Sequence, residues 1–204
     1  MIPMATSTTC RRNIENLRRA DWALLLTPDR PERWGFNKIA IDNGAWGCFQ
    51  RQIEWTPDRF LPLVQEHGAD ALWVVAPDIV MGGSESLARS LSWLPELLQL
   101  TPRVLIAVQN GMTADDLRPH VGERVGIFVG GDTEWKEFSL PMWGKLAAET
   151  ACWLHVGRVN SARRIRLCAL AGAHSFDGTS ASKYAVTLPR LDGAARQHSW
   201  RFDL

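Results

Sequence analysis

Short apolar segments alternate with amphipathic segments along almost the whole chain. Runs of four or five residues rich in Val, Leu and Ile are each followed by a turn and then by apolar residues at helical spacing. Runs of this length are typical of buried strands, and the stretches between them are typical of helices that cover a sheet. Because strands joined through helices run parallel, the pattern predicts an α/β fold with a parallel sheet.

Eight such units can be counted. The predicted strands are 1–5, 22–26, 38–41, 72–76, 104–108, 125–129, 153–156 and 174–176. Eight strand–helix units are what a (β/α)8 TIM barrel requires, and the 204 residues are fewer than the roughly 250 that this fold usually has. We therefore predict a compact barrel that forms a single domain over residues 1–204, with a loose tail from about residue 190. A doubly wound open sheet is the alternative.

Charge and cysteine content exclude several classes of protein. The net charge of +1 argues against a general polycationic coat, although Arg11, Arg12, Arg18 and Arg19 form a local basic group. The usual interpretation of such a group is a solvated helix face. The four cysteines are widely spaced, without a Cys-x-x-Cys pair or a histidine at ligand spacing, so we predict no metal, no cofactor and no disulfide.

The chain also lacks the signatures of membrane proteins and of exported proteins. Its longest apolar runs, such as 71–77, are far too short to cross a membrane. The N-terminus has no hydrophobic signal region and no cleavage signature. We predict a cytoplasmic protein with no membrane partner, and the sequence does not indicate its oligomeric state.

Polar residues and glycines follow most of the predicted strands. They are Asp42, Asp78, Gln109, Gly130, Gly131, Gly157 and Asp177. An Asp after a single strand is usually a turn former or a helix cap. In a (β/α)8 barrel, however, the carboxyl ends of all strands meet above one packed core, where active sites lie. Several carboxyl groups in one cavity would shift one another's pKa, as an acid–base or nucleophilic site requires.

The turn after the last predicted strand has the composition of a phosphate site. Asp177 is followed by a glycine, by hydroxyl residues and by a lysine where a helix is predicted to begin. Backbone amides and hydroxyl groups at a helix start can bind a phosphate. We therefore predict that phosphate is bound by Thr179, Ser180, Ser182 and Lys183.

The order of these motifs resembles the tRNA-guanine transglycosylase superfamily, which includes relatives that act on DNA. The resemblance runs from about Ile39 to Lys183. The matching motifs are Asp42-Asn43-Gly44-Ala45-Trp46, Asp78, Val108-Gln109-Asn110-Gly111, Gly130-Gly131, Leu154-His155-Val156-Gly157 and Phe176-Asp177. The resemblance implies that Asp177 is the nucleophile and that Asp42 is an acid or base. It further implies that a nucleobase is bound by Asn43, Trp46, Asp78, Gln109, Gly130, Gly131 and His155.

Departures from the superfamily pattern point to the substrate. The Cys-x-Cys-x-x-Cys zinc motif of the tRNA enzymes is missing and the chain is much shorter, which favours DNA over tRNA. We predict a DNA glycosylase that flips out a modified base, cleaves its N-glycosidic bond and releases the free nucleobase, with anti-phage defence as the expected setting.

Three alternatives remain from the sequence. One is a transglycosylase that inserts a 7-deazaguanine-type base into DNA or tRNA. Another is a non-catalytic protein that binds a modified base. The last is an unrelated barrel that acts on a small phosphorylated metabolite.

Overall fold

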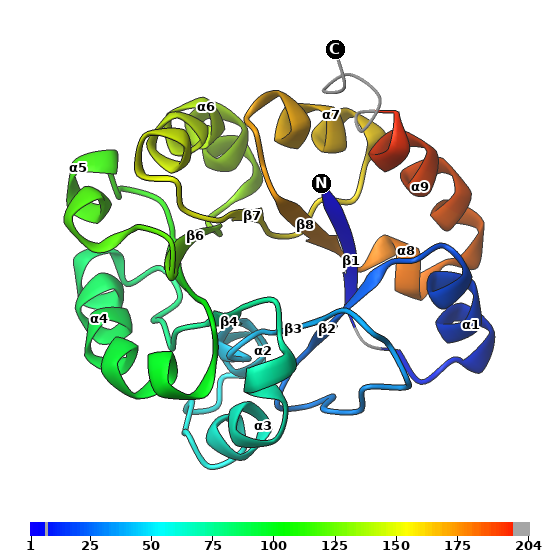
Figure 1. Cartoon of the computed structure of the whole chain (residues 1–204), viewed down its shortest axis with the longest axis horizontal. Coiled ribbons are helices and arrows are strands. Elements are labelled where there is room, and N and C mark those ends of the chain that lie inside the picture. The colour runs from blue at the N-terminus through cyan, green and yellow to red at the C-terminus, as the bar shows by residue number, and fades with distance from the viewer. Residues whose placement is uncertain (7, 198–204) are drawn as a thin grey trace.

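The computed structural model describes residues 1–6 and 8–197 and shows a closed barrel of eight parallel strands (Figure 1). Each strand pairs with the next one along the chain, and the last strand pairs with the first, where Met4 lies opposite Asp177. Helices surround the barrel on its outer side. This architecture confirms the predicted (β/α)8 barrel and excludes the open sheet.

The strands lie close to the predicted segments. They are β1 (Ile2–Thr6), β2 (Ala23–Leu26), β3 (Ile39–Ile41), β4 (Val74–Val75), β5 (Val104–Val108), β6 (Val125–Val129), β7 (Leu154–Val156) and β8 (Ser175–Gly178). Their shortness explains how the barrel closes in so few residues. β4 contributes only two residues, yet Ala76 beyond its end still donates a backbone hydrogen bond to Leu105.

The α-helices follow the strands in chain order. They are α1 (Arg11–Arg19), α2 (Ala45–Gln50), α3 (Phe60–His67), α4 (Gly83–Leu100), α5 (Ala114–Leu117), α6 (Thr133–Thr150), α7 (Ala162–Leu170), α8 (Ser180–Lys183) and α9 (Leu188–Arg196). Short 3-10 turns are η1 (Gly68–Asp70), η2 (Arg118–His120) and η3 (Ala185–Thr187). Within the described part of the chain, no helix has the combination of length and apolar character needed to cross a membrane.

Two segments differ from the regular pattern. The connection from β2 to β3 contains no helix and is irregular. α2 was not predicted, because its six residues directly follow the Asp42 motif, which is typical of a turn.

The chain after residue 190 is not a loose tail as far as residue 197. α9 packs on the barrel through Leu188 and Leu191, and the Trp22 indole donates a hydrogen bond to Asp192 Oδ1 at 3.0 Å. The rest of the predicted tail, residues 198–204, lies outside the described residues.

The core has two layers, which follow from the two faces of each strand. Outward-facing residues such as Ile39 and Ile41 pack against the helices. Inward-facing residues fill the barrel, where Met4, Leu25 and Trp73 belong to one buried cluster. The Trp73 ring meets Phe128 edge-on, with 6.1 Å between the ring centroids. The interior is therefore a packed floor, and polar side chains can gather only above it.

Candidate active site at the barrel mouth

Four of the predicted site residues meet at the mouth of the barrel, above the carboxyl ends of the strands. Asp42 follows β3, Asp78 follows β4, Gln109 follows β5 and Asp177 lies within β8. The charges of Asp177 and Asp78 both contribute to raising the pKa of Asp42, and Gln109 Nε2 lies 3.5 Å from Asp78 Oδ2. Side chains that are far apart in the sequence thus share one electrostatic environment.

Asp177 is held by two hydrogen-bond donors. It is nearly buried, and its Oδ1 atom lies 3.1 Å from His155 Nε2 and 3.3 Å from the backbone nitrogen of Arg158. Gly157 is also close, since a Cβ atom there would lie 3.4 Å from the same oxygen. Donors from the end of β7 therefore fix the orientation of this carboxylate.

His155 belongs to a hydrogen-bond chain that rises from the barrel floor to Asp177. The Trp153 indole donates to Ser175 Oγ at 2.9 Å, and Ser175 Oγ lies 2.8 Å from His155 Nδ1. Because an ionised carboxylate can only accept, Asp177 requires a proton on Nε2, and Nδ1 of the neutral ring then accepts from the Ser175 hydroxyl. The ring proton then lies on Nε2 and points at the Asp177 carboxylate. Burial lowers the pKa of His155, which favours this neutral tautomer at neutral pH.

His155, which was predicted to bind the base, has all its hydrogen-bond partners within the protein. The ring has no exposed surface, stacks on Phe128 with 4.8 Å between centroids, and uses both nitrogens within the hydrogen-bond chain. The histidine lies beneath the carboxylate because β7 residues alternate between the two faces of the strand. It positions Asp177 instead of touching a ligand.

Asp42 lies in the turn that follows β3. Burial is the main cause that raises its pKa from 3.8 to about 7, and the nearby charges of Asp177 and Asp78 act in the same direction. A hydrogen bond of 2.7 Å from the Gly44 backbone amide opposes the rise. Gly44 has φ +79° and a Cβ atom there would lie 3.0 Å from Pro28, so glycine is required for this turn. At neutral pH the Asp42 carboxyl group can therefore hold a proton or give one away.

Asp78 is supported by a network below the mouth surface. Asn43 Nδ2 donates to Asp78 Oδ1 at 2.8 Å and to the Ala76 carbonyl at 2.7 Å, while its Oδ1 accepts from Ala45. Burial raises the pKa of Asp78, partly offset by the Asn43 hydrogen bond. Asn43 is only 2% exposed. In this structure Asn43, which was predicted to contact a base, supports Asp78 from below.

Gln109 also differs from its predicted role. Its Nε2 donates to the Ile79 carbonyl and to Ser86 Oγ, both at 2.8 Å, and its Oε1 accepts from the Met81 amide. These bonds use both amide hydrogens and tie β5 to the loop after Asp78. Gln109 thus fixes the wall of the mouth, because its amide is already satisfied by the protein.

Trp46 lies on the rim of the mouth, as a predicted stacking residue should. The ring is 41% exposed, stacks on Phe49, and carries the Arg158 guanidinium at 4.6 Å from its centroid. Arg158 also donates to the Gly131 carbonyl. Of the Gly130-Gly131 pair that was predicted to bind a base, Gly131 thus already has its carbonyl hydrogen-bonded to Arg158. Arg158 links the loops after β3, β6 and β7 across the mouth.

The predicted phosphate site is only partly formed. Thr179 and Lys183 are exposed, but the Ser180 amide already binds Asn160 Oδ1 at 2.9 Å and Ser182 is buried, donating to the Thr179 carbonyl. α8 is also a single turn, too short to develop a helix dipole of useful size. Ser180 and Ser182 shape the turn, which leaves Thr179 and Lys183 for contacts with a ligand.

Two residues near Asp177 were not singled out for this site. Lys136 of α6 is 6% exposed, and its ammonium group donates to the Gly157 carbonyl at 2.6 Å. Burial lowers the pKa of Lys136 to about 8, while the charge of Asp177 acts in the opposite direction. Arg158 has φ +59°, a strained conformation for a non-glycine residue that aims its amide at Asp177. Lys136 places positive charge near the Asp177 carboxylate, and Arg158 places a backbone donor beside it.

Comparisons with known proteins support the fold alone. The sequence matches no protein-family model, and a search of curated proteins finds no match either. A solved structure of tryptophan synthase from M. tuberculosis superposes with a TM-score of 0.55 at 13% identity, covering 97% of this chain and 91% of that one. A thiamine phosphate pyrophosphorylase from Pyrococcus furiosus gives a TM-score of 0.38 at 10% identity, with 97% and 94% covered. The first similarity agrees with the barrel fold.

Proposed function

We propose that this protein cleaves the N-glycosidic bond of a nucleobase in DNA, with a modified base as the expected target. The observation that carries the proposal is the contrast between two carboxyl groups in one mouth. Asp177 is held by hydrogen-bond donors, whereas Asp42 is desolvated with a pKa of about 7. A carboxylate that is fixed by donors and a nearby carboxyl group of raised pKa are suited to act as a nucleophile and an acid.

The chemistry of the bond assigns each group a task. Cleavage passes through an oxocarbenium-like state, so positive charge develops at the sugar C1′ atom while the electron pair leaves with the base. The Asp177 carboxylate stabilises or captures C1′, and Asp42 gives its proton to the departing base. The ionised Asp42 then takes a proton from a water molecule whose oxygen attacks C1′. Where Asp177 has captured C1′, the bond between them breaks as the water adds and its electron pair returns to the Asp177 carboxylate. The products are a free base and an abasic site.

The surroundings of the two carboxyl groups fit these tasks. His155 and the Arg158 amide hold Asp177 in one orientation, as a nucleophile requires. Asp78 is braced by Asn43 and lies near Asp42, where it can contact the edge of a base. Trp46 lies partly exposed at the rim beside Arg158, where the two side chains can contact a flipped base. The resemblance to tRNA-guanine transglycosylases, stated from sequence motifs, leads to the same assignment.

Base release is the direct test. The protein is incubated with unmodified DNA, with DNA that carries modified bases and with tRNA, and released bases and alkali-labile sites are measured by mass spectrometry. We expect a free base and an abasic site from one of the DNA substrates. Release that occurs only when a second base is supplied would identify a transglycosylase instead. Binding without release from any substrate would reject the glycosylase and favour a base-binding protein.

A further inference from the structure

α1 concentrates positive charge on the surface of the barrel. Its nine residues contain four arginines against one acidic residue, Glu15, whereas the whole chain has a net charge of only +1. Arg11 and Arg12 lie at its start, and Arg18 and Arg19 at its end. All four are exposed. The buried side of the helix is formed by Asn13, Ile14 and Leu17, so the charged side faces away from the core.

These four guanidinium groups form no hydrogen bond or ion pair within residues 1–6 and 8–197. Elsewhere on the surface arginines commonly have carboxylate partners, such as Arg33 with Asp70 at 2.8 Å and Arg163 with Glu137 at 2.7 Å. Glu15 lies within one turn of both arginine pairs, yet no ion pair forms with either. The charge on α1 is thus available to an external anion.

The position of α1 connects this charge to the barrel mouth. The helix begins after β1, and Asn13 Nδ2 donates to the Ser182 carbonyl in α8 at 2.6 Å. α8 directly follows Asp177, and its exposed Lys183 lies against the exposed ring of Tyr184, with the ammonium 5.3 Å from the ring centroid. Positive charge therefore extends from the loop beside Asp177 along α1.

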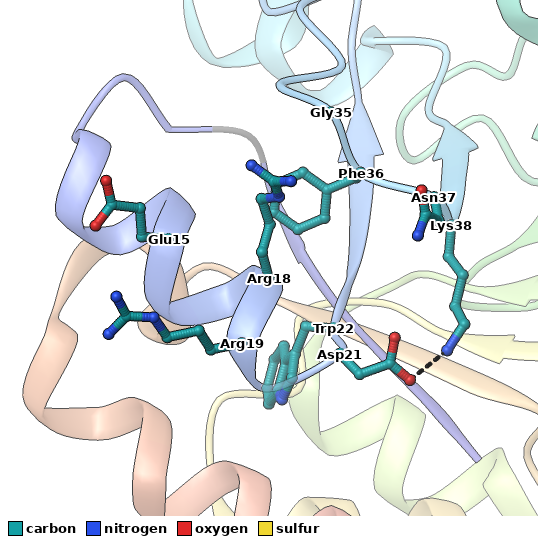
Figure 2. A pocket seen from close by; sticks show the side chains of 9 residues that line it. All are labelled: Glu15, Arg18, Arg19, Asp21, Trp22, Gly35, Phe36, Asn37 and Lys38. Carbon is teal, nitrogen blue, oxygen red and sulfur yellow. Dashed lines mark hydrogen bonds and ion pairs between the residues drawn. The ribbon is translucent and has the colours of Figure 1, made fainter.

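The far end of this surface is hollow. A pocket of about 370 Å³ lies between the end of α1 and residues 35–38, and Figure 2 shows the Arg18 guanidinium beside the Phe36 ring. The pocket lies where the β2–β3 connection lacks a helix. Lys38 is paired with Asp21 there, whereas Arg18 and Arg19 have no ion-pair partner in the described part of the chain. At a rise of about 1.5 Å per residue, the two arginine pairs are ~10 Å apart along the helix.

We propose that the exposed face of α1, together with Lys183, binds the phosphate backbone of the DNA strand that flanks the nucleotide in the mouth. The inference rests on the proposed function, because it places the flanking DNA beside Asp177. Arginine is suited to this contact because its planar guanidinium donates two parallel hydrogen bonds to a phosphate. A row of arginines that starts on the mouth side at Arg11 and Arg12, and that has no partner among the described residues, is complementary to a strand of regularly spaced negative charges.

The test measures binding without cleavage. Fluorescence anisotropy follows a labelled 20-base-pair duplex of unmodified DNA between low and moderate NaCl concentrations. The variants are Arg11→Ala/Arg12→Ala and Arg18→Ala/Arg19→Ala. The matched control is Arg118→Ala/Lys145→Ala, which removes two positive charges around Glu149 on the α5–α6 side of the barrel, opposite α1 in Figure 1. Arg18→Lys/Arg19→Lys retains the charge.

We expect each α1 double alanine variant to bind at least ~10-fold more weakly and to lower the slope of log K against log salt by up to ~2, because each lost phosphate contact contributes ~0.9. The control should stay within about twofold of the wild type, and the lysine variant should keep the slope. An equal loss in the control, or no loss in the α1 variants, would overturn the inference. So would arginine-dependent binding to vesicles of anionic lipid with none to DNA.

The outcome for α1 is separable from that of the proposed function. If the α1 variants lose DNA binding while no base is ever released by the wild type, only the glycosylase proposal fails. If a base is released and the α1 variants bind and cleave like the control, only the assignment of α1 fails. Thermal melting of each variant checks that the exposed substitutions leave the fold intact.

Discussion

Replacing Asp42 by asparagine should change how the stability of the protein depends on pH. The free carboxyl group has a pKa near 3.9 in the unfolded chain and about 7 in the fold. Between these values the native state keeps a proton that the unfolded state has lost, so a rise in pH favours unfolding. The full difference corresponds to ~4 kcal/mol at about 1.36 kcal/mol per pH unit. The wild type should thus lose stability from this group between pH 4 and pH 7.

The Asp42→Asn substitution introduces an amide, which cannot ionise. The free energy of unfolding of the variant therefore lacks the decrease that Asp42 causes between pH 4 and pH 7. The amide keeps an oxygen that can accept the hydrogen bond from Gly44, while burial of the extra amide hydrogens costs ~1–3 kcal/mol at every pH. That constant cost cancels when the difference between variant and wild type is compared across pH. We expect the variant to gain ~3 kcal/mol relative to the wild type between pH 5 and pH 8.

Urea unfolding at several pH values measures this difference directly. The contribution of His155 is present in both proteins and largely cancels in the comparison, whereas Asp78 interacts with the Asp42 charge, so the measured difference includes their coupling. A variant and a wild type whose unfolding free energies run parallel from pH 5 to pH 8 would refute the raised pKa of Asp42. The acid role assigned to this residue would fall with it.

Further predictions concern the groups around the two carboxyl groups. His155→Gln should reduce base release by ~10–100-fold with little change in DNA affinity, because it removes a group that positions Asp177; a loss of affinity with unchanged turnover would contradict this role. Asn43→Ala should lower the free energy of unfolding by ~1–3 kcal/mol, because the buried Ala76 carbonyl loses its partner, and an unchanged urea midpoint would argue against the network. The rate of base release should fall above pH 7, because Asp42 must hold its proton, and a rate that keeps rising to pH 9 would exclude it as the acid.

The fold was readable from the sequence because local signals agreed with one another. Buried parallel strands such as β5 and β6 are continuous apolar runs, and their predicted bounds are the observed ones. Strand ends in a barrel must converge, so Asp42, Asp78 and Asp177 could be placed together from their positions alone. The sequence could not show that α2 begins directly after the Asp42 turn, because six residues carry too little periodicity.

The roles of individual polar residues were harder to predict, because they depend on partners far along the chain. His155 and Asn43 follow the same strand-end pattern as the carboxyl groups, but alternation and burial direct them beneath the mouth. Lys136 offered one readable signal, since it shares the helical stripe of the buried Leu140 and Trp143. The left-handed backbone of Arg158 had no sequence signal, because it results from the packing of the loop around Asp177.

The central claim is that Asp177 attacks or stabilises the sugar at this mouth. It is tested most directly by comparing the wild type with Asp177→Asn on the DNA from which the wild type releases a base. Binding of the same DNA by both proteins serves as the reference. We expect the variant to bind this DNA with similar affinity but to release no base above background. A variant that releases the base at the rate of the wild type would contradict it.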